Sequence, residues 1–295
     1  MGDVAAVLQN YTAFIDQEMD RYLPSSTTYP QALMESMRYS VFAGGKRLRP
    51  GLVLVTAKAC RATERVAVVP ACALEFVHTY SLIHDDLPAM DDDDYRRGKL
   101  TNHKVFGEAH AVLAGDALLT LAFELLTTGE LTDAIKVRLI SELAVASGAF
   151  GMVGGQAADI LQEGRTVSKR DVEYIHRHKT GALLRASVRM GAICADAAPD
   201  LLQALTSYAE AVGLAFQIAD DILDVIGDAK TLGKETGADV ALQKATWPAL
   251  FGIEASQAKV DQLTKQALDI LPDASSSFDP SQLAEIAVWL SHRDY

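Results

Sequence analysis

The chain has 295 residues, of which 49% are hydrophobic and 22% charged, and its formal net charge is −12. This length allows a large buried core, and the acidic balance excludes nucleic acid as a partner, because no pool of Lys and Arg is left to displace the counterions of a phosphate backbone. Three cysteines in apolar surroundings (Cys60, Cys72 and Cys194) and the lack of an apolar leader predict a reduced, cytoplasmic protein.

The sequence predicts an all-α protein, because strand-like alternation with hairpin turn signals is missing. Proline is absent between Pro88 and Pro199, an interval that can hold several long helices. The expected helices cover residues 4–22, 31–42, 50–61, 67–87, 107–127, 133–163, 169–195, 199–227, 246–271 and 281–293. No flexible linker or shift in composition divides the chain, so we expect one domain over residues 1–295.

Three glycines, Gly148, Gly151 and Gly155, recur at three- and four-residue spacing in the sixth expected helix. Each costs roughly 1 kcal/mol of helix propensity, which suggests a buried central helix that a neighbour approaches closely. The most apolar stretch, Leu139 to Gly155, is interrupted by Glu142 and four glycines. We therefore expect no membrane span.

Six aspartates fall within the ten residues from Asp85 to Asp94, at the end of the fourth expected helix. A charge run of this kind is most often a solvated loop. Here it follows directly on an apolar helix, and a second aspartate cluster lies downstream, which favours a functional site. Pro88 interrupts the helix, so the spacing leaves open whether Asp91 or Asp92 converges with Asp85.

The second cluster places Gln217, Asp220, Asp221 and Asp224 at i, i+3, i+4 and i+7, on one face of a helix. Carboxylates on facing helices, with no Cys and few His nearby, suit a hard cation such as Mg²⁺. This ion completes its shell with water and phosphate oxygens. We therefore expect a phosphate or diphosphate substrate, held between two acidic walls through metal ions.

Basic residues lie beside both acidic clusters in the sequence. They are Lys46, Arg47 and Arg49 after a helix stop at Gly44-Gly45, the pair Arg96 and Arg97, the segment 176–181, and Lys234 with Lys244. Each alone is more often a surface charge. Together, in a net-acidic chain, they predict a diphosphate-binding rim.

These stretches together resemble the trans-isoprenyl diphosphate synthase family, specifically its bacterial farnesyl diphosphate synthase type. The matching segments are 44–50, 75–98 with a DDxxxxD motif, 106–108, 113–118, 154–159, 178–181, 216–224 and 232–234. The resemblance implies a helical isoprenoid synthase bundle with a central active-site cavity, usually homodimeric. It also implies head-to-tail condensation of isopentenyl diphosphate with dimethylallyl or geranyl diphosphate.

The resemblance also assigns the site residues. Two or three Mg²⁺ ions bind Asp85, Asp91 and Asp220, with Asp86, Asp221 and Asp224 in support. Isopentenyl diphosphate is held by Lys46, Arg49, His78 and Arg97. The allylic diphosphate is held by Arg96, Lys179 and Lys234, while Thr180 and Gln217 face the reacting carbon.

Product length depends in this family on the fourth and fifth positions before the first aspartate, here Ser81 and Tyr80. Ser81 lies about 6 Å below Asp85 along the helix, and the Tyr80 ring must reach across to close the pocket. This pattern predicts a C15 product, farnesyl diphosphate. The alternatives are a geranylgeranyl or geranyl diphosphate synthase, a terpene cyclase, which has no need of the isopentenyl-binding cations, and a non-catalytic partner subunit.

Overall fold

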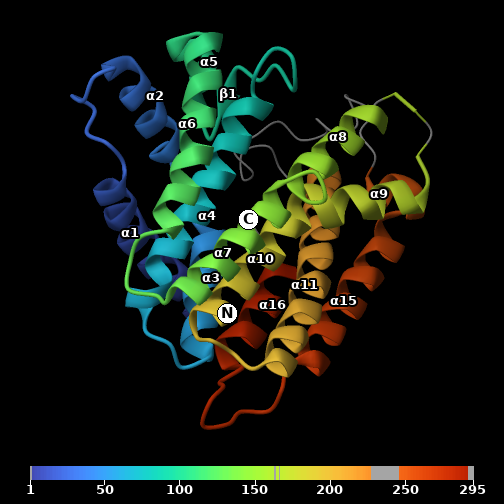
Figure 1. The fold of residues 1–295 in the computed structure, drawn as a ribbon. Coiled ribbons are helices and arrows are strands. Elements are labelled where there is room, and N and C mark those ends of the chain that lie inside the picture. Colours follow the sequence, from blue (N-terminus) through green and yellow to red (C-terminus); the bar gives the residue numbers. More distant parts are fainter. Residues whose placement is uncertain (1, 163, 166, 227–245, 292–295) are drawn as a thin grey trace.

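The computed structural model describes residues 2–162, 164–165, 167–226 and 246–291, and these fold almost entirely into helices (Figure 1). The helices are α1 (Gly2–Tyr22), α2 (Gln31–Val41), α3 (Leu48–Ala59), α4 (Glu64–Asp85), α5 (Asn102–Phe106), α6 (Glu108–Leu126), α7 (Asp133–Ser147), α8 (Met152–Gln162), α9 (Lys169–Ile175), the π-helical turn η1 (His176–Thr180), α10 (Gly181–Cys194), α11 (Pro199–Ile226), α14 (Trp247–Phe251), α15 (Ile253–Ile270) and α16 (Ser281–Ser291). The expected all-α class is confirmed.

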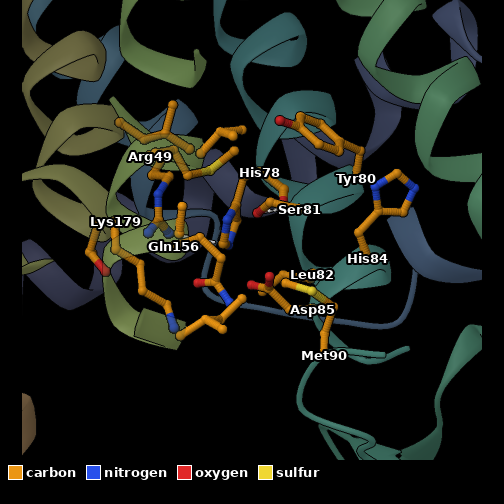
Figure 2. Close-up of a pocket in the computed structure, with 16 residues that line it drawn as sticks. Arg49, His78, Tyr80, Ser81, Leu82, His84, Asp85, Met90, Gln156 and Lys179 are labelled. Atoms are coloured by element: carbon orange, nitrogen blue, oxygen red, sulfur yellow. Dashed lines mark hydrogen bonds between the residues drawn. The ribbon is translucent and has the colours of Figure 1, made fainter. Parts of the chain in front are cut away.

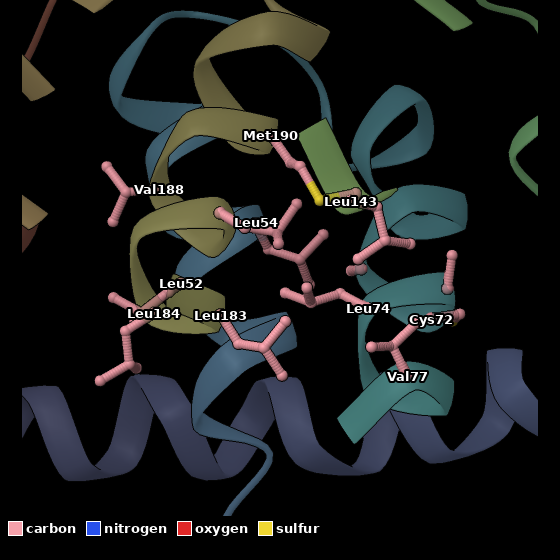
Figure 3. Packing of buried hydrophobic residues seen from close by; sticks show 14 of the residues in the cluster. Leu52, Leu54, Cys72, Leu74, Val77, Leu143, Leu183, Leu184, Val188 and Met190 are labelled. Carbon is pink, nitrogen blue, oxygen red and sulfur yellow. The ribbon is translucent and has the colours of Figure 1, made fainter. Parts of the chain in front are cut away.

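Two helices, α4 and α10, form the centre of the bundle. Helix α10 packs against α3, α7 and α11, and α4 packs against α3 and α6. In Figure 3, leucines and valines from α10, α3 and α4 fill the space between these helices. A Cβ on Gly191 would come within 2.5 Å of Val53 O, so glycine permits the close approach of α10 to α3.

The sixth expected helix, residues 133–163, is interrupted. Helix α7 ends at Ser147 because Gly148 adopts an extended conformation, and α8 begins at Met152. The prediction of one continuous, buried helix was therefore wrong. The predicted close approach of a neighbouring helix is confirmed at Gly155. A Cβ there would lie 2.6 Å from Lys179 Cα in the neighbouring turn η1.

Other boundaries also differ from the sequence prediction. The expected helix 169–195 contains the π-helical turn η1, and the expected helix 246–271 is divided at Gly252, whose φ is +80°. A short antiparallel hairpin of β1 (Tyr95–Arg96) and β2 (Lys99–Leu100) follows the aspartate run. The hairpin positions the two arginines that close the run.

In the part of the chain that the structure describes, three helical segments are long and apolar enough, by length and composition, to cross a membrane: Glu64–Asp85, Glu108–Leu126 and Asp133–Gln162. The first has 72% of its apolar window buried inside the fold, so core packing accounts for its composition. The last is divided between α7 and α8. The absence of a membrane span stays a prediction.

Candidate active site

A cavity of about 430 Å³ opens between α4, α8 and η1. We call it the central cavity. Figure 2 shows Lys179, Gln156 and Arg49 on one side of it, Tyr80 and His84 on the other, and Asp85 and Ser81 between them. The remaining lining is largely apolar, and most of it comes from α8, with further residues from α4, the loop after α4 and the start of α10. The cavity thus combines charged groups with largely apolar walls.

The loop after α4 brings Asp91 back beside the end of the helix. The Asp91 N–H donates to Asp85 O at 2.9 Å, while Asp92 adopts a left-handed conformation with φ 51° and is exposed. Burial lowers the pKa of Lys179, but the carboxylates of Asp159, Asp85 and Asp91 outweigh burial and raise it. Asp85 and Asp91 therefore lie near Lys179, which favours Asp91 over Asp92 as the partner of Asp85.

Two expected site residues, Asp86 and Arg96, are paired with each other. Arg96 Nε donates to Asp86 Oδ1 at 2.6 Å, and Arg96 Nη2 also lies 3.6 Å from Asp93. Burial raises the pKa of Asp86 to about 6, although Arg96 opposes the shift. In this arrangement Asp86 anchors Arg96 at the rim of the site.

A second cavity, of about 480 Å³, lies beside the first, and we call it the basic pocket. Its lining includes Lys46, Arg49, His78 and Arg97, the four residues expected to hold one diphosphate. Arg49 and His78 line both cavities, with Arg49 Nη1 3.2 Å from His78 Nε2. The structure therefore brings this predicted set together.

The basic pocket has the electrostatics of an anion site. Burial, and then Arg97, lowers the pKa of Arg49 to about 10, although Glu75 and Asp220 oppose the shift. Burial and the surrounding arginines hold the pKa of His78 well below its usual value of 6.5. Arg49 Nε is buried and makes no hydrogen bond within the described part of the chain, so a donor is available to a ligand oxygen.

Gly45 shapes the wall of the basic pocket. Its φ is +124°, and a Cβ there would lie 2.6 Å from Arg97 Cζ. The Arg97 guanidinium donates to the neighbouring Gly44 O. Gly45 therefore does more than help to stop a helix, because its missing side chain lets the guanidinium lie directly on the backbone.

The residues of the second aspartate cluster have different contact partners. Asp221 Oδ2 accepts a hydrogen bond from Trp247 N at 2.7 Å and lies 3.2 Å from His176 Nε2. Asp220 is close enough to Arg49 to affect its pKa, and Asp224 is buried. The four residues share a face of α11 as predicted, but they have different surroundings.

The remaining predicted residues are placed as follows. Thr180 lines the central cavity at the end of η1, and Gln217 is half-buried on α11. Tyr80 and Ser81 both line the cavity, and Tyr80 is only 6% exposed. Lys234 lies outside the described residues.

A family model described as polyprenyl synthetase matches residues 30–277. The chain belongs to the polyprenyl synthetase family. It is 49% identical to the farnesyl diphosphate synthase of Escherichia coli K12 and 46% identical to that of Geobacillus stearothermophilus, in each case over 95% of both chains. A solved structure of an FPP/GFPP synthase from Zymomonas mobilis superimposes with a TM-score of 0.84 at 38% identity, covering 98% of this chain and 100% of the other.

Within this polyprenyl synthetase, two side chains to which the sequence analysis gave no individual role support the predicted site residues. Asp159 Oδ2 lies 2.6 Å from Lys179 Nζ, and His176 contacts Asp221 as described. The available signal was Gly155, whose missing side chain lets η1 approach α8. Asp159 follows one turn later on the same face.

No three His, Cys, Asp or Glu side chains among the described residues lie close enough together to hold a metal ion. Proteins typically bind Mg²⁺ through one or two carboxylates, while water and substrate phosphates complete the shell. The acidic groups beside the cavity supply only oxygen donors, the type that Mg²⁺ prefers.

Proposed function

We propose that this polyprenyl synthetase is a farnesyl diphosphate synthase. It would condense isopentenyl diphosphate head to tail with dimethylallyl and then geranyl diphosphate. One observation carries the proposal: a largely apolar cavity has Lys179 and Arg49 at one side, Tyr80 at the other, and Asp85 between them. The names of the Escherichia coli and Geobacillus stearothermophilus relatives support it.

The two substrates would occupy adjoining sites. The basic pocket supplies Lys46, Arg49, His78 and Arg97 for isopentenyl diphosphate, because these side chains line one cavity and Arg49 Nε is a buried donor. The allylic diphosphate would lie against Lys179, Arg96 and Lys234, with its hydrocarbon tail in the central cavity. Arg49 and His78 line both cavities, which keeps the two reacting ends close.

Two or three Mg²⁺ ions would bind with the substrate at Asp85, Asp91 and Asp220, supported by Asp86, Asp221 and Asp224. When bound, the metal supplies positive charge that stabilises a departing diphosphate. Lys179 adds a fixed cation at the same wall, where the low dielectric strengthens its effect.

The reaction needs ionisation rather than a basic side chain. The allylic C–O bond breaks and its electron pair leaves with the diphosphate, and the alkene of isopentenyl diphosphate then forms the new C–C bond. The released diphosphate accepts the proton lost from the adjacent carbon. Thr180 and Gln217 would face the reacting carbon, while Met152, Ile160 and Leu183 exclude water from the cation.

Product length would be limited by Tyr80 and Ser81. Tyr80 lies five residues before Asp85 on α4, about 7.5 Å along the axis, and its ring lines the cavity. A ring at this depth fits a C15 product. Geranyl and geranylgeranyl diphosphate remain the alternative products on the same fold, and product analysis of the wild type decides between them.

We expect a cytoplasmic homodimer. Large apolar side chains are exposed along α6, α7 and the turn that follows α7: Leu113 is 54% exposed, Val137 65% and Phe150 84%. Exposed apolar side chains that form a contiguous patch commonly mark an interface. A second copy of the chain would cover it.

The test is an incubation of the purified protein with Mg²⁺, isopentenyl diphosphate and either dimethylallyl or geranyl diphosphate. We expect farnesyl diphosphate as the main chromatographic product from both, with no turnover after EDTA treatment. An absence of diphosphate release with either allylic substrate would contradict the proposal and favour a non-catalytic subunit. A C10 or C20 main product would retain the reaction and change the specificity.

A further inference from the structure

His84, the residue before the first aspartate, occupies a recess in the backbone of α6. Its Nε2 donates to Val112 O at 3.1 Å, because a carbonyl can only accept. A Cβ on Gly115 would come within 2.5 Å of His84 Cδ2. The missing side chain at Gly115 therefore makes the space that the imidazole fills.

The same imidazole packs against Tyr80, one turn earlier on α4. The two rings meet edge to face, with centroids 5.7 Å apart and an interplanar angle of 76°. Figure 2 shows both rings on the side of the central cavity away from Lys179. Tyr80 thus has the imidazole on one side, and the imidazole has the α6 backbone behind it.

We propose that His84, seated by Gly115, is a specificity-determining residue that sets product length together with Tyr80. This inference rests on the proposed function and deepens it. A phenol ring alone on one helix can change rotamer as a prenyl chain grows toward it. The Tyr80 ring packs against an imidazole that is itself hydrogen-bonded to a second helix, so it cannot change rotamer in this way.

The structure predicts opposite effects for two substitutions. His84→Ala removes both the support of Tyr80 and part of the cavity wall, so longer chains fit. In Gly115→Ala the added methyl group would overlap the His84 ring. The ring moves away from α6, because it is the end of a flexible side chain, whereas the helix backbone is rigid. The imidazole then enters the cavity that it lines, and shorter chains result.

The experiment measures the C10, C15 and C20 products of purified wild type and variants with isopentenyl and dimethylallyl diphosphates. We expect His84→Ala to raise the C20 to C15 ratio about tenfold and Gly115→Ala to raise the C10 to C15 ratio by a similar factor. The double variant His84→Ala/Gly115→Ala should match His84→Ala, because the added methyl then meets no ring. Gly213→Ala is the matched control: it adds a methyl to another helix at ordinary contact, 3.6 Å from Gly181 Cα, and should leave the ratios unchanged.

Thermal melts of each variant check that it is folded. If His84→Ala does not fold, Gly115→Ala still tests the inference, because it only displaces a side chain. Unchanged product ratios in a folded His84→Ala, or a Gly115→Ala effect that persists in the double variant, would overturn the inference. Either result would leave the proposed function standing if the wild type makes farnesyl diphosphate. A wild type that forms no prenyl product would instead refute the proposed function, and this inference with it.

Discussion

Lys179 Nζ lies 2.6 Å from Asp159 Oδ2, and this ion pair joins the π-helical turn η1 to helix α8 at the wall of the central cavity. The Asp159 side chain is only 12% exposed and that of Lys179 25%. Gly155 permits the close approach that the pair needs. The position of the expected catalytic ammonium is therefore set by a second helix as well as by its own.

Asp159→Asn should raise the KM for geranyl diphosphate about tenfold and change kcat less, because the ammonium loses the carboxylate that holds it at the cavity wall. Steady-state kinetics with geranyl diphosphate varied measure this effect. Asp196→Asn is the matched control: it removes a carboxylate from an exposed pair with Arg138, also at 2.6 Å, and should leave the KM unchanged. An unaltered KM in Asp159→Asn would show that Lys179 is positioned without its partner.

His176→Phe should weaken the response to Mg²⁺ about tenfold, since groups behind metal-binding carboxylates typically contribute this much. An aromatic ring is kept opposite Trp247, whose centroid lies 6.3 Å away, but Asp221 loses its imidazole partner and keeps only Trp247 N–H. The Mg²⁺ concentration that gives half-maximal activity measures the effect. His178→Ala in the same turn, whose ring stacks on Tyr174 at 3.9 Å, should behave as wild type. An identical Mg²⁺ response in His176→Phe would assign the contact to folding alone.

Periodicity predicted the shared face of Gln217, Asp220 and Asp224 and the extents of most helices, because helix geometry is local. It did not predict where a glycine ends a helix: Gly148 and Gly155 both belong to the same expected helix, yet the first interrupts it and the second packs against Lys179. The two glycines differ in what packs against them, and the spacing of residues in the sequence carries no information on such tertiary contacts.

The sequence also could not predict which side chains contact the site residues. Asp159 and His176 lie 20 and 45 residues from Lys179 and Asp221, respectively, and only the fold brings each pair together. The choice between Asp91 and Asp92 depended on a loop conformation that the single proline left undetermined. The hydrogen bond from Asp91 N–H to Asp85 O favours Asp91, and the choice itself stays a prediction.

Substitutions at these two aspartates should differ strongly. Asp91→Asn should lower kcat/KM about 100-fold, a loss typical of removing one electrostatic stabiliser of the transition state. Asp92→Asn should change it less than about threefold, because this side chain is exposed and its backbone already fixes the loop. Product formation at saturating Mg²⁺ compares the two variants directly. Equal losses in both would mean that the loop presents Asp92 as well.

His78 should make the free energy of unfolding depend on pH. Its pKa is held well below 6.5 by burial and by Arg49, Arg97, Arg96 and Arg47, so the unfolded chain binds a proton that the folded chain rejects. As pH falls below about 6.5, stability should therefore decrease, by up to about 1.4 kcal/mol per pH unit from this group. Urea unfolding of wild type and His78→Gln between pH 5 and about 7.5 separates this contribution from that of other groups. Parallel pH profiles for the two proteins would refute the assignment.

Arg47 should contribute to stability rather than to substrate binding, although it lies between two expected ligands in the sequence. It is 3% exposed, its Nη1 lies 2.8 Å from Glu75 Oε1, and its Nε lies 2.8 Å from Asp16 Oδ1. Arg47→Met leaves Glu75 buried without its counter-charge, so we expect a loss of about 3–5 kcal/mol in the free energy of unfolding. Chemical denaturation measures the loss, and Arg65→Met, which removes an exposed pair with Glu130, should cost less than about 1 kcal/mol. If Arg47→Met instead kept wild-type stability and raised the KM for isopentenyl diphosphate, Arg47 would belong with Lys46 and Arg49 as a ligand.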